Sequence, residues 1–161
     1  PFAYRLVVDD LNGDGLDDVF AGSMGLSVEK EKGWGIDPYP HFLLLSNSSG
    51  KFEESSANIN DENNGLGQLC SFAHDASGGD PDGDGDIDLF ACNMLLVNDG
   101  EGNFTIHPYL NLEWYYKHLS PMSSILVDLN NDGFDDIVFW NFNDRWNFNE
   151  MPEEGFILLS N

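Results

Sequence analysis

The sequence contains three copies of one acidic nine-residue loop, at residues 10–18, 80–88 and 128–136. Each copy fits the pattern D-x-[ND]-x-D-G-x-x-D, which places oxygen-bearing side chains at positions 1, 3, 5 and 9 and glycine at position 6. Hard cations such as Ca²⁺ take several oxygen ligands at once, and alternate positions of a tightly turning loop converge on one point. Glycine permits the sharp turn, and the backbone carbonyl of position 7 supplies a further oxygen. The pattern predicts one Ca²⁺ ion per loop, or about three ions in all.

Short apolar stretches flank each loop in the same order. They predict strands at 4–8, 19–21, 42–45 and 51–54, then at 72–77, 89–91, 94–97 and 103–106, and finally at 124–127, 137–139 and 156–159. Four short strands repeating around one loop predict a four-stranded antiparallel meander, which is the unit of a β-propeller blade. The stretch 25–40, between the second and third strands of the first copy, is expected to be irregular. No stretch shows a 3.6-residue period, so no helix longer than one turn is expected.

The predicted fold is therefore all-β, with about three blades, the last incomplete. The whole chain, 1–161, is expected to form a partial β-propeller with blades at 4–58, 68–110 and 122–161. Three blades do not close a ring, since propellers typically have about four to eight. The ring is expected to be completed by remaining blades of the same chain or by neighbouring subunits.

Composition restricts the partners. The chain carries 29 acidic and 6 basic residues, a net charge of −23, which argues against nucleic acid and an anionic membrane surface as partners. No apolar run approaches the roughly 18 residues of a membrane span, so no membrane insertion is expected. Cys70 and Cys92 do not define a disulfide framework. Their pairing stays open, and the unpaired state is favoured because the predicted register does not place them opposite each other.

The loop pattern has two alternatives to a propeller-type metal site, an EF-hand and a plain acidic turn. An EF-hand requires a bidentate glutamate at position 12 and flanking helices. Position 12 holds Ala21, Ala91 and Phe139, and the flanks read as strands, which argues against an EF-hand. A plain acidic turn is common singly, but three such turns with identical spacing favour metal binding.

The loop, the Val-Phe or Leu-Phe strand that follows it, and the later run L-L-L-S-N-x-x-G-x-F at 43–52 resemble the FG-GAP/VCBS repeat of integrin-α-like β-propellers. The resemblance is closer to the bacterial-type repeat, because a literal Gly-Ala-Pro element is missing. It implies a ring of about seven blades and Ca²⁺ in the loop between strands one and two. The implied ligands are Asp10, Asn12, Asp14, Leu16 (backbone) and Asp18; Asp80, Asp82, Asp84, Asp86 (backbone) and Asp88; and Asp128, Asn130, Asp132, Phe134 (backbone) and Asp136.

Aromatic residues gather in the connections between strands two and three and between blades. The candidates for a ligand-binding face are Trp34, Tyr39, Trp114, Tyr115, Tyr116, Trp140, Arg145 and Trp146. In a meander these connections emerge at the end opposite to the metal loops. Exposed aromatic side chains suit stacking on sugars or a protein interface, whereas the alternative is that they pack as small local cores.

The remaining signals are weaker. Asn47 and Asn103 begin N-glycosylation sequons at the turns between strands three and four, and Asn47 is expected to be the more readily occupied. His74 and Asp75 are expected in an inner strand, with His74 hydrogen-bonded. No catalytic motif is present, and His41, His118 and Arg145 are the only candidates for an enzyme site.

The sequence therefore favours a secreted or cell-surface Ca²⁺-binding module for adhesion, binding or assembly, with a carbohydrate or protein ligand. Two alternatives stay open. One is a polysaccharide lyase or hydrolase on a propeller scaffold, and the other is a structural subunit of an extracellular filament or matrix.

Overall fold

The computed structural model describes residues 2–24, 26–30, 33–37, 39–60, 69–70, 74–92, 94–107, 120–142 and 155–160. Within these ranges the only helical element is a three-residue 3₁₀ turn, η1 (Ser56–Asn58), and the other elements are strands. The all-β prediction and the absence of a long helix are confirmed for the described residues. None of these residues forms a helix long and apolar enough to cross a membrane.

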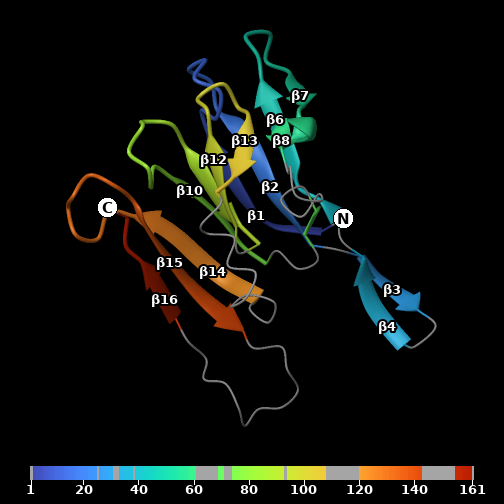
Figure 1. Ribbon diagram of the computed structural model, residues 1–161. Coiled ribbons are helices and arrows are strands. Elements are labelled where there is room, and N and C mark those ends of the chain that lie inside the picture. Colours follow the sequence, from blue (N-terminus) through green and yellow to red (C-terminus); the bar gives the residue numbers. More distant parts are fainter. Residues whose placement is uncertain are drawn as a thin grey trace.

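Three antiparallel sheets follow one another along the chain (Figure 1). The first has the order β1 (Phe2–Asp9), β2 (Asp18–Met24), β6 (Phe42–Ser46) and β7 (Phe52–Glu54). The second has β10 (Ala76–Gly79), β11 (Asp88–Ala91), β12 (Met94–Asn98) and β13 (Phe104–Ile106), followed by β8 (Ile59–Asn60). The third has β14 (Ser120–Val127), β15 (Asp136–Phe142) and β16 (Gly155–Leu158). These are the predicted meanders, with the third holding three strands.

The first strands of the sheets, β1, β10 and β14, lie next to one another (Figure 1). Two glycines of β10 allow this close approach. A Cβ atom at Gly78 would lie 2.8 Å from Val7 Cγ1 of β1, and one at Gly79 would lie 2.5 Å from Leu126 Cβ of β14. Both distances are shorter than a real Cβ contact, so a larger residue at either position would push the sheets apart.

The core consists of two layers, one on each face of the second sheet. Leu89 and Leu96 face the first sheet and pack with its Phe20 and Leu43. The residues next to them in β11 and β12 point the other way, into a cluster with the third sheet. That cluster contains Phe90, Leu95, Leu126, Ile137 and Phe139. Because neighbouring strand residues point to opposite faces, the continuous apolar runs of β11 and β12 reflect a sheet buried on both sides.

The outward faces of the first and third sheets carry exposed apolar side chains. Leu6 and Val8 of β1 are more than half exposed, while Val7 between them packs into the core. On the third sheet Ile125, Trp140 and Ile157 are at least half exposed. Among the described residues, each outer sheet is therefore covered on the side that faces the second sheet and carries exposed apolar side chains on the other.

The chain also links the first two sheets after the first meander ends. β8 pairs in parallel with β13, and Ile59 is buried in the core between the sheets. This strand was not predicted, because two residues give no periodicity. It covers the outer edge of the second sheet, which would otherwise expose unpaired backbone groups.

The expectation of an irregular stretch over 25–40 is wrong. Strands β3 (Leu26–Lys30) and β4 (Gly33–Asp37) form an antiparallel hairpin that extends from the end of the first sheet remote from its acidic loop (Figure 1). β5 (Tyr39–Pro40) then pairs with β9 (Leu69–Cys70). The apolar and polar residues of the run L-S-V-E-K alternate, which is typical of a strand. The facing strand contains two glycines and shows no such alternation, so the hairpin was not predicted.

The placement of His74 and Asp75 in an inner strand is also wrong. Both residues precede β10, whose pairing with β11 begins at Ala76 opposite Ala91. Asp75 instead turns its side chain toward the neighbouring sheets. Residues 71–73, the rest of the predicted strand before Ala76, lie outside the described residues.

The structure corrects the expectation for the cysteines as well. Cys92 is disulfide-bonded, and the only other cysteine of the chain is Cys70. Cys92 follows the last paired residue of β11 and has a φ of 54°. Cys70 belongs to β9, which pairs with β5 outside the three large sheets. The register of the meanders therefore carries no information about this bond.

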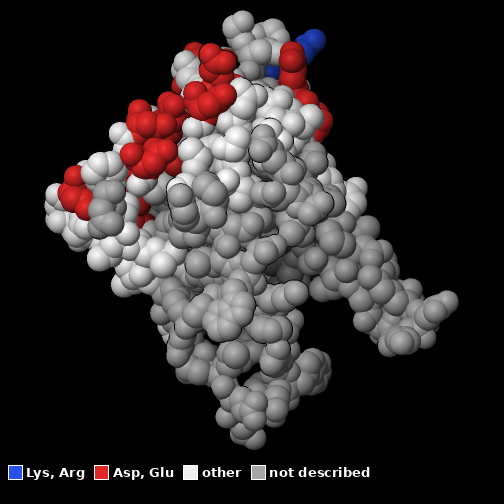
Figure 2. All heavy atoms as spheres, viewed as in Figure 1, with Lys and Arg blue, Asp and Glu red and all other residues white. Residues whose placement is uncertain are grey.

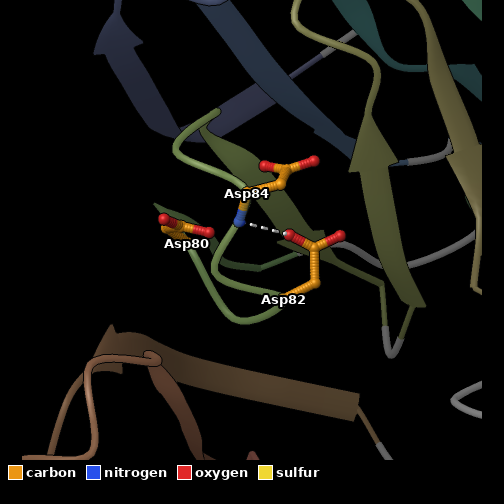
Figure 3. Close-up of side chains that lie close together, drawn as sticks. All are labelled: Asp80, Asp82 and Asp84. Atoms are coloured by element: carbon orange, nitrogen blue, oxygen red, sulfur yellow. Dashed lines mark hydrogen bonds between the residues drawn. The ribbon is translucent and has the colours of Figure 1, made fainter.

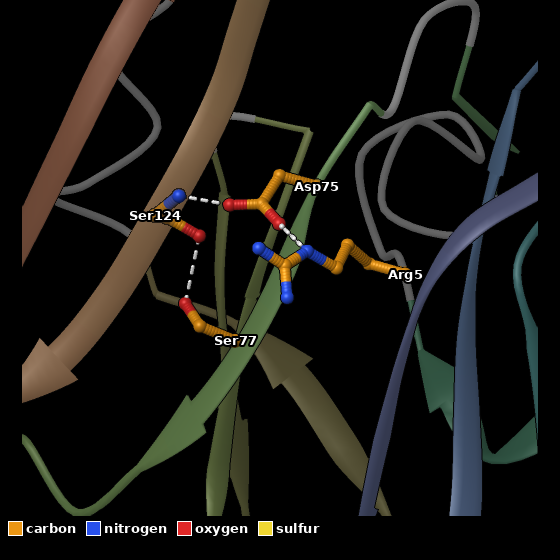
Figure 4. Close-up of polar contacts among 4 residues, drawn as sticks. All are labelled: Arg5, Asp75, Ser77 and Ser124. Atoms are coloured by element: carbon orange, nitrogen blue, oxygen red, sulfur yellow. Dashed lines mark hydrogen bonds and ion pairs between the residues drawn. The ribbon is translucent and has the colours of Figure 1, made fainter.

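A buried polar tie connects the first strands of all three sheets (Figure 4). The Asp75 side chain is almost fully buried and accepts a hydrogen bond from the Ser124 backbone amide. Its Oδ1 lies 3.1 Å from Arg5 Nε, an ion pair that lacks hydrogen-bond geometry. Beside it the hydroxyl groups of Ser77 and Ser124 are 2.8 Å apart. Asp75 thus receives one contact from β1 and one from β14.

We predict that Asp75→Ala lowers the free energy of unfolding by about 1–3 kcal/mol, because it leaves the Ser124 amide without its acceptor. Urea denaturation measures the change. Ser77→Ala, which removes only the neighbouring hydroxyl contact, is the matched control and should cost less. Equal losses for the two variants would contradict a central role for Asp75.

His41 provides a second test of the fold. Its ring is fully buried against Phe20, and its Nδ1 accepts a hydrogen bond of 3.0 Å from the Ser23 amide. Burial lowers the pKa of His41 from 6.5 to about 4. The ring is therefore neutral in the folded state and is shielded from solvent, which does not suit it to act as a catalytic base.

We predict that His41 makes the fold sensitive to mild acid. Between pH 6.5 and about 4 the unfolded chain binds a proton at His41 that the folded chain does not. The free energy of unfolding is therefore highest above pH 6.5 and falls as the pH drops through this range, by about 3 kcal/mol in total once the folded chain is also protonated. His41→Asn keeps an acceptor for the Ser23 amide and does not titrate, so its stability should fall less over this range. Parallel pH profiles of the two proteins in urea denaturation would exclude the effect.

Candidate metal centre

The three acidic loops lie along one edge of the molecule. Each loop connects the first strand of a sheet to the second, so all three emerge at the same end of the meanders (Figure 1). Figure 2 shows Asp and Glu side chains gathered along this edge. A cavity of about 270 Å³ between the first and second loops is lined by the acidic residues Asp9, Asp10 and Asp86, among others.

One hydrogen-bond network recurs in all three loops. The position-6 glycine amide donates to the position-1 carboxylate, at 2.7 Å for Gly15 to Asp10, 3.0 Å for Gly85 to Asp80 and 3.0 Å for Gly133 to Asp128. The position-5 amide donates to the position-3 side chain, and the position-7 amide donates to the position-5 carboxylate. These bonds wrap each loop around its side-chain oxygens.

The wrapping depends on two left-handed residues in each loop. Position 6 is glycine throughout, with φ between 85° and 95°. Position 4 is also left-handed, at Gly13 (73°), Gly83 (74°) and Asn131 (58°). Asparagine is one of the few residues with a Cβ that adopts this conformation at low cost. The sequence predicted the turn at position 6 only, although the choice of Gly, Gly and Asn at position 4 was the available signal.

The second loop brings three carboxylates together. Single oxygens of Asp80, Asp82 and Asp84 all lie within 4.8 Å of one another (Figure 3). Burial raises the pKa of Asp82, and the charges of Asp84 and Asp80 raise it further. In the first and third loops position 3 is Asn12 or Asn130, so the corresponding set has one carboxylate fewer. Converging hard oxygens on a rigid turn fit a cation such as Ca²⁺.

The position-9 aspartates have a structural role that the sequence analysis missed. Asp18 and Asp136 are fully buried, and each carboxylate bridges two chain segments. One oxygen accepts the position-2 amide, from Leu11 or Leu129, at 3.0 Å in both loops. The other oxygen accepts an amide at the end of the third strand of the same sheet, from Ser46, the last residue of β6, at 2.6 Å and from Ser160, just after β16, at 2.9 Å. Each aspartate therefore fastens its loop to the end of the third strand.

Asp88, the position-9 residue of the second loop, makes only half of this bridge. Its Oδ1 accepts the Asn98 amide at 2.7 Å, whereas its buried Oδ2 has no hydrogen-bond partner. Burial raises the pKa of Asp88 to about 7, and the charges of Asp82, Asp84 and Asp80 add to the shift. A buried, unpaired carboxylate oxygen in a loop that also brings three carboxylates together fits a bound cation better than an ion-free loop.

The position-7 residues are predicted to bind through their backbone carbonyls, and their side chains have other surroundings in each loop. Leu16 is partly exposed, the Phe134 ring lies against Gly83 of the second loop, and the Asp86 carboxylate lies beside Gly100. The second and third loops are also joined by two hydrogen bonds, one accepted by a side chain and one by a backbone carbonyl. Asp80 donates its amide to Asp135 Oδ2, and Asp135 donates its amide to the Asp80 carbonyl, both at 2.9 Å.

The predicted aromatic face is only partly within the described residues. Tyr39 lies in β5, half-buried with its ring centroid 6.1 Å from that of Phe42, and Trp34 lies in β4. Trp140 lies in β15 and is half exposed. Tyr39 and Trp140 therefore belong to separate sheets. Trp114, Tyr115, Tyr116, Arg145 and Trp146, together with His118, lie outside the described residues.

Both sequons lie in turns, as predicted. Asn47 begins the turn between β6 and β7 and is half-buried, and its side chain binds Ser49 and Glu53. Asn103 ends the turn between β12 and β13 and is exposed, although its amide nitrogen donates to Asp99. The preference for Asn47 stays a prediction.

Residues 80–139 match the model of the FG-GAP-like repeat family. The match begins at the first residue of the second loop, ends within β15 and includes the third loop. No curated protein matches the chain. The resemblance expected from the loop and strand pattern is confirmed for this segment.

Proposed function

Because residues 80–139 are an FG-GAP-like repeat, we propose that this chain is part of a Ca²⁺-stabilised β-propeller that acts as an extracellular binding or adhesion module. FG-GAP-like repeats are typical of propeller-type modules that mediate protein interactions. The observation that carries the proposal is the hydrogen-bond network shared by the three loops. It wraps side-chain oxygens at the same positions three times along one edge of the molecule.

In this proposal the residues at positions 1, 3, 5 and 9 and the position-7 carbonyl of each loop hold one Ca²⁺ ion. The ion, when bound, supplies positive charge to a chain whose net charge is −23. Asp80, Asp82 and Asp84 already face one another before any ion is added, so their mutual repulsion favours cation binding. The role is structural, because each loop joins the first two strands of its sheet.

The outward faces of the outer sheets support a larger ring. Leu6 and Val8 on one side, and Ile125, Trp140 and Ile157 on the other, are apolar and at least half exposed. Their inward neighbours Val7 and Leu126 pack against the second sheet. We infer that further blades, from the same chain or from neighbouring subunits, cover these faces in the same way.

Three features support an extracellular location. Cys92 is disulfide-bonded, and disulfides persist in oxidising compartments. Both sequons lie at surface turns, where an attached glycan has room. The acidic loops are suited to the high Ca²⁺ concentrations outside cells, at which weak sites of about 10⁻⁴–10⁻³ M are filled. The ligand is a carbohydrate or a protein, bound at the end of the blades opposite to the acidic loops.

We predict that EDTA lowers the melting temperature of the protein and that added Ca²⁺ restores it, because the ion neutralises clustered carboxylates in the folded state only. Differential scanning calorimetry measures both steps. A melting temperature that does not respond to either reagent would refute the metal proposal.

Single-loop variants locate the sites. Asp14→Ala, Asp84→Ala and Asp132→Ala each remove the position-5 carboxylate of one loop, and each should remove one Ca²⁺ from the stoichiometry in isothermal titration calorimetry. Glu101→Ala, which removes an exposed carboxylate outside the loops, is the matched control and should leave the stoichiometry unchanged.

The binding role has a separate test. On an array of glycans we expect selective binding that Trp34→Ala weakens, because Trp34 lies in the hairpin that extends from the end of the first sheet remote from its acidic loop (Figure 1), and an indole offers a flat surface for a sugar ring. Ile36→Ala changes an apolar residue of the same strand without removing an aromatic ring and serves as the control. Turnover of a polysaccharide would favour a lyase or hydrolase instead, and formation of polymers without ligand binding would favour a structural subunit.

A further inference from the structure

The three loops differ at position 2, which the repeat pattern leaves unspecified. Leu11 and Leu129 occupy it in the first and third loops, and Pro81 occupies it in the second. Proline has no backbone N–H. The second loop therefore lacks the donor that bonds Oδ2 of the position-9 aspartate at 3.0 Å in the other two loops.

The missing donor accounts for the orphaned oxygen of Asp88. Its side chain is fully buried, and Oδ2 has no hydrogen-bond partner. Oδ1 of Asp88 is bonded at the end of the third strand, as Oδ1 is in Asp18 and Asp136, so Oδ2 of Asp88 corresponds to the oxygen that accepts the position-2 amide in the sister loops. A buried, unpaired carboxylate oxygen destabilises the ion-free loop, and a cation beside it removes that penalty.

A lost hydrogen bond can also weaken a metal site, if it leaves the ligand free to rotate. Asp88 keeps its orientation, because Oδ1 accepts the Asn98 amide at 2.7 Å. Asn98 is itself fixed, since its side-chain amide donates to the carbonyls of Leu11 and Ile87 at 2.9 and 3.1 Å. The orientation is therefore preserved, and the main effect of proline is to leave one oxygen unpaired.

We propose that the second loop is the highest-affinity Ca²⁺ site of the three and fills first, because Pro81 leaves a buried oxygen of Asp88 free for the ion. The proposal rests on the Ca²⁺ binding proposed above. The position-3 carboxylate of Asp82 acts in the same direction, since the other loops have asparagine there. The second loop is also tied to the third through Asp80 and Asp135, so the first ion is bound next to the contact between these loops.

The order of filling is measured by NMR. The amides of Gly15, Gly85 and Gly133 each donate to the position-1 carboxylate of one loop and thus report on that loop alone. During a Ca²⁺ titration of the full chain, the Gly85 resonance should shift at a lower Ca²⁺ concentration than the other two. Simultaneous shifts, or an earlier shift of Gly15 or Gly133, would overturn the proposal.

Pro81→Ala restores an N–H group without changing any charge. We expect it to weaken Ca²⁺ binding at the second loop roughly tenfold and to raise the melting temperature of the Ca²⁺-free protein by about 2–4 °C. Loss of proline alone loosens the unfolded chain and lowers stability, so the expected rise has the opposite sign. Pro40→Ala, which removes a proline of β5 outside the loops, is the control for that effect.

Leu129→Pro is the reciprocal variant, at an exposed position of the third loop. It should tighten the third site, so that Gly133 shifts at a lower Ca²⁺ concentration than in the unaltered protein. If Leu129→Pro fails to fold, Pro81→Ala still decides the question. Unchanged affinity and melting temperature in Pro81→Ala would refute the role of Pro81, whereas absence of Ca²⁺ binding in the unaltered protein would refute the proposed metal function itself.

Discussion

The arrangement of each sheet depends on one buried carboxylate. Asp18 and Asp136 each accept one amide from the acidic loop and one from the end of the third strand, so each fixes its loop relative to the third strand. A buried carboxylate is costly unless donors surround it, and here the donors are backbone amides that would otherwise be unpaired. The aspartate at position 9 therefore belongs to the fold as well as to the predicted metal site. This explains why loop and turn recur together in each copy, although 28 residues separate Asp18 from Ser46 and 10 separate Asp88 from Asn98.

Contacts between sheets depend on the second sheet, which packs against the first sheet on one face and against the third on the other. Small residues of β10 let the first strands approach, and Asp75 links β1 and β14 across them. The acidic loops extend the same contact along the edge, since the Phe134 ring covers Gly83 and Asp135 binds Asp80. An ion in the second loop would thus stabilise both its own turn and the surface on which the third loop packs. These contacts would couple the proposed metal binding to the packing of the sheets.

Local patterns predicted most of the strands, because the loop and the apolar runs beside it are set by residues near in sequence. The turns at Asn47 and Asn103 followed from the same patterns. Three features depended on contacts between distant segments and were missed: the pairing of β8 with β13, the disulfide of Cys92, and the tie from Asp75 to Ser124. The hairpin β3–β4 was missed for another reason, since Trp34 stands between two glycines and gives little alternation. Whether the position-9 carboxylates bind an ion, a backbone amide or both could not be read from their spacing.

Position 2 of the loops shows that a repeat pattern, which compares side chains, does not record the hydrogen bonds made by the backbone. The side chains of Leu11, Pro81 and Leu129 range from fully buried to half exposed. The three loops therefore place no common requirement on the side chain at position 2, and the repeat pattern leaves it unspecified. What the fold uses at this position is the N–H group, which every residue except proline supplies. A comparison of side chains therefore treats the three loops as equivalent, whereas a count of donors and acceptors separates them. That count leaves one acceptor without a donor, Oδ2 of Asp88, in the loop where the carboxylates of Asp80, Asp82 and Asp84 come together. A cation is the partner whose charge and ligand preference match this group, so the loop that departs from the repeat is the loop best prepared to bind one.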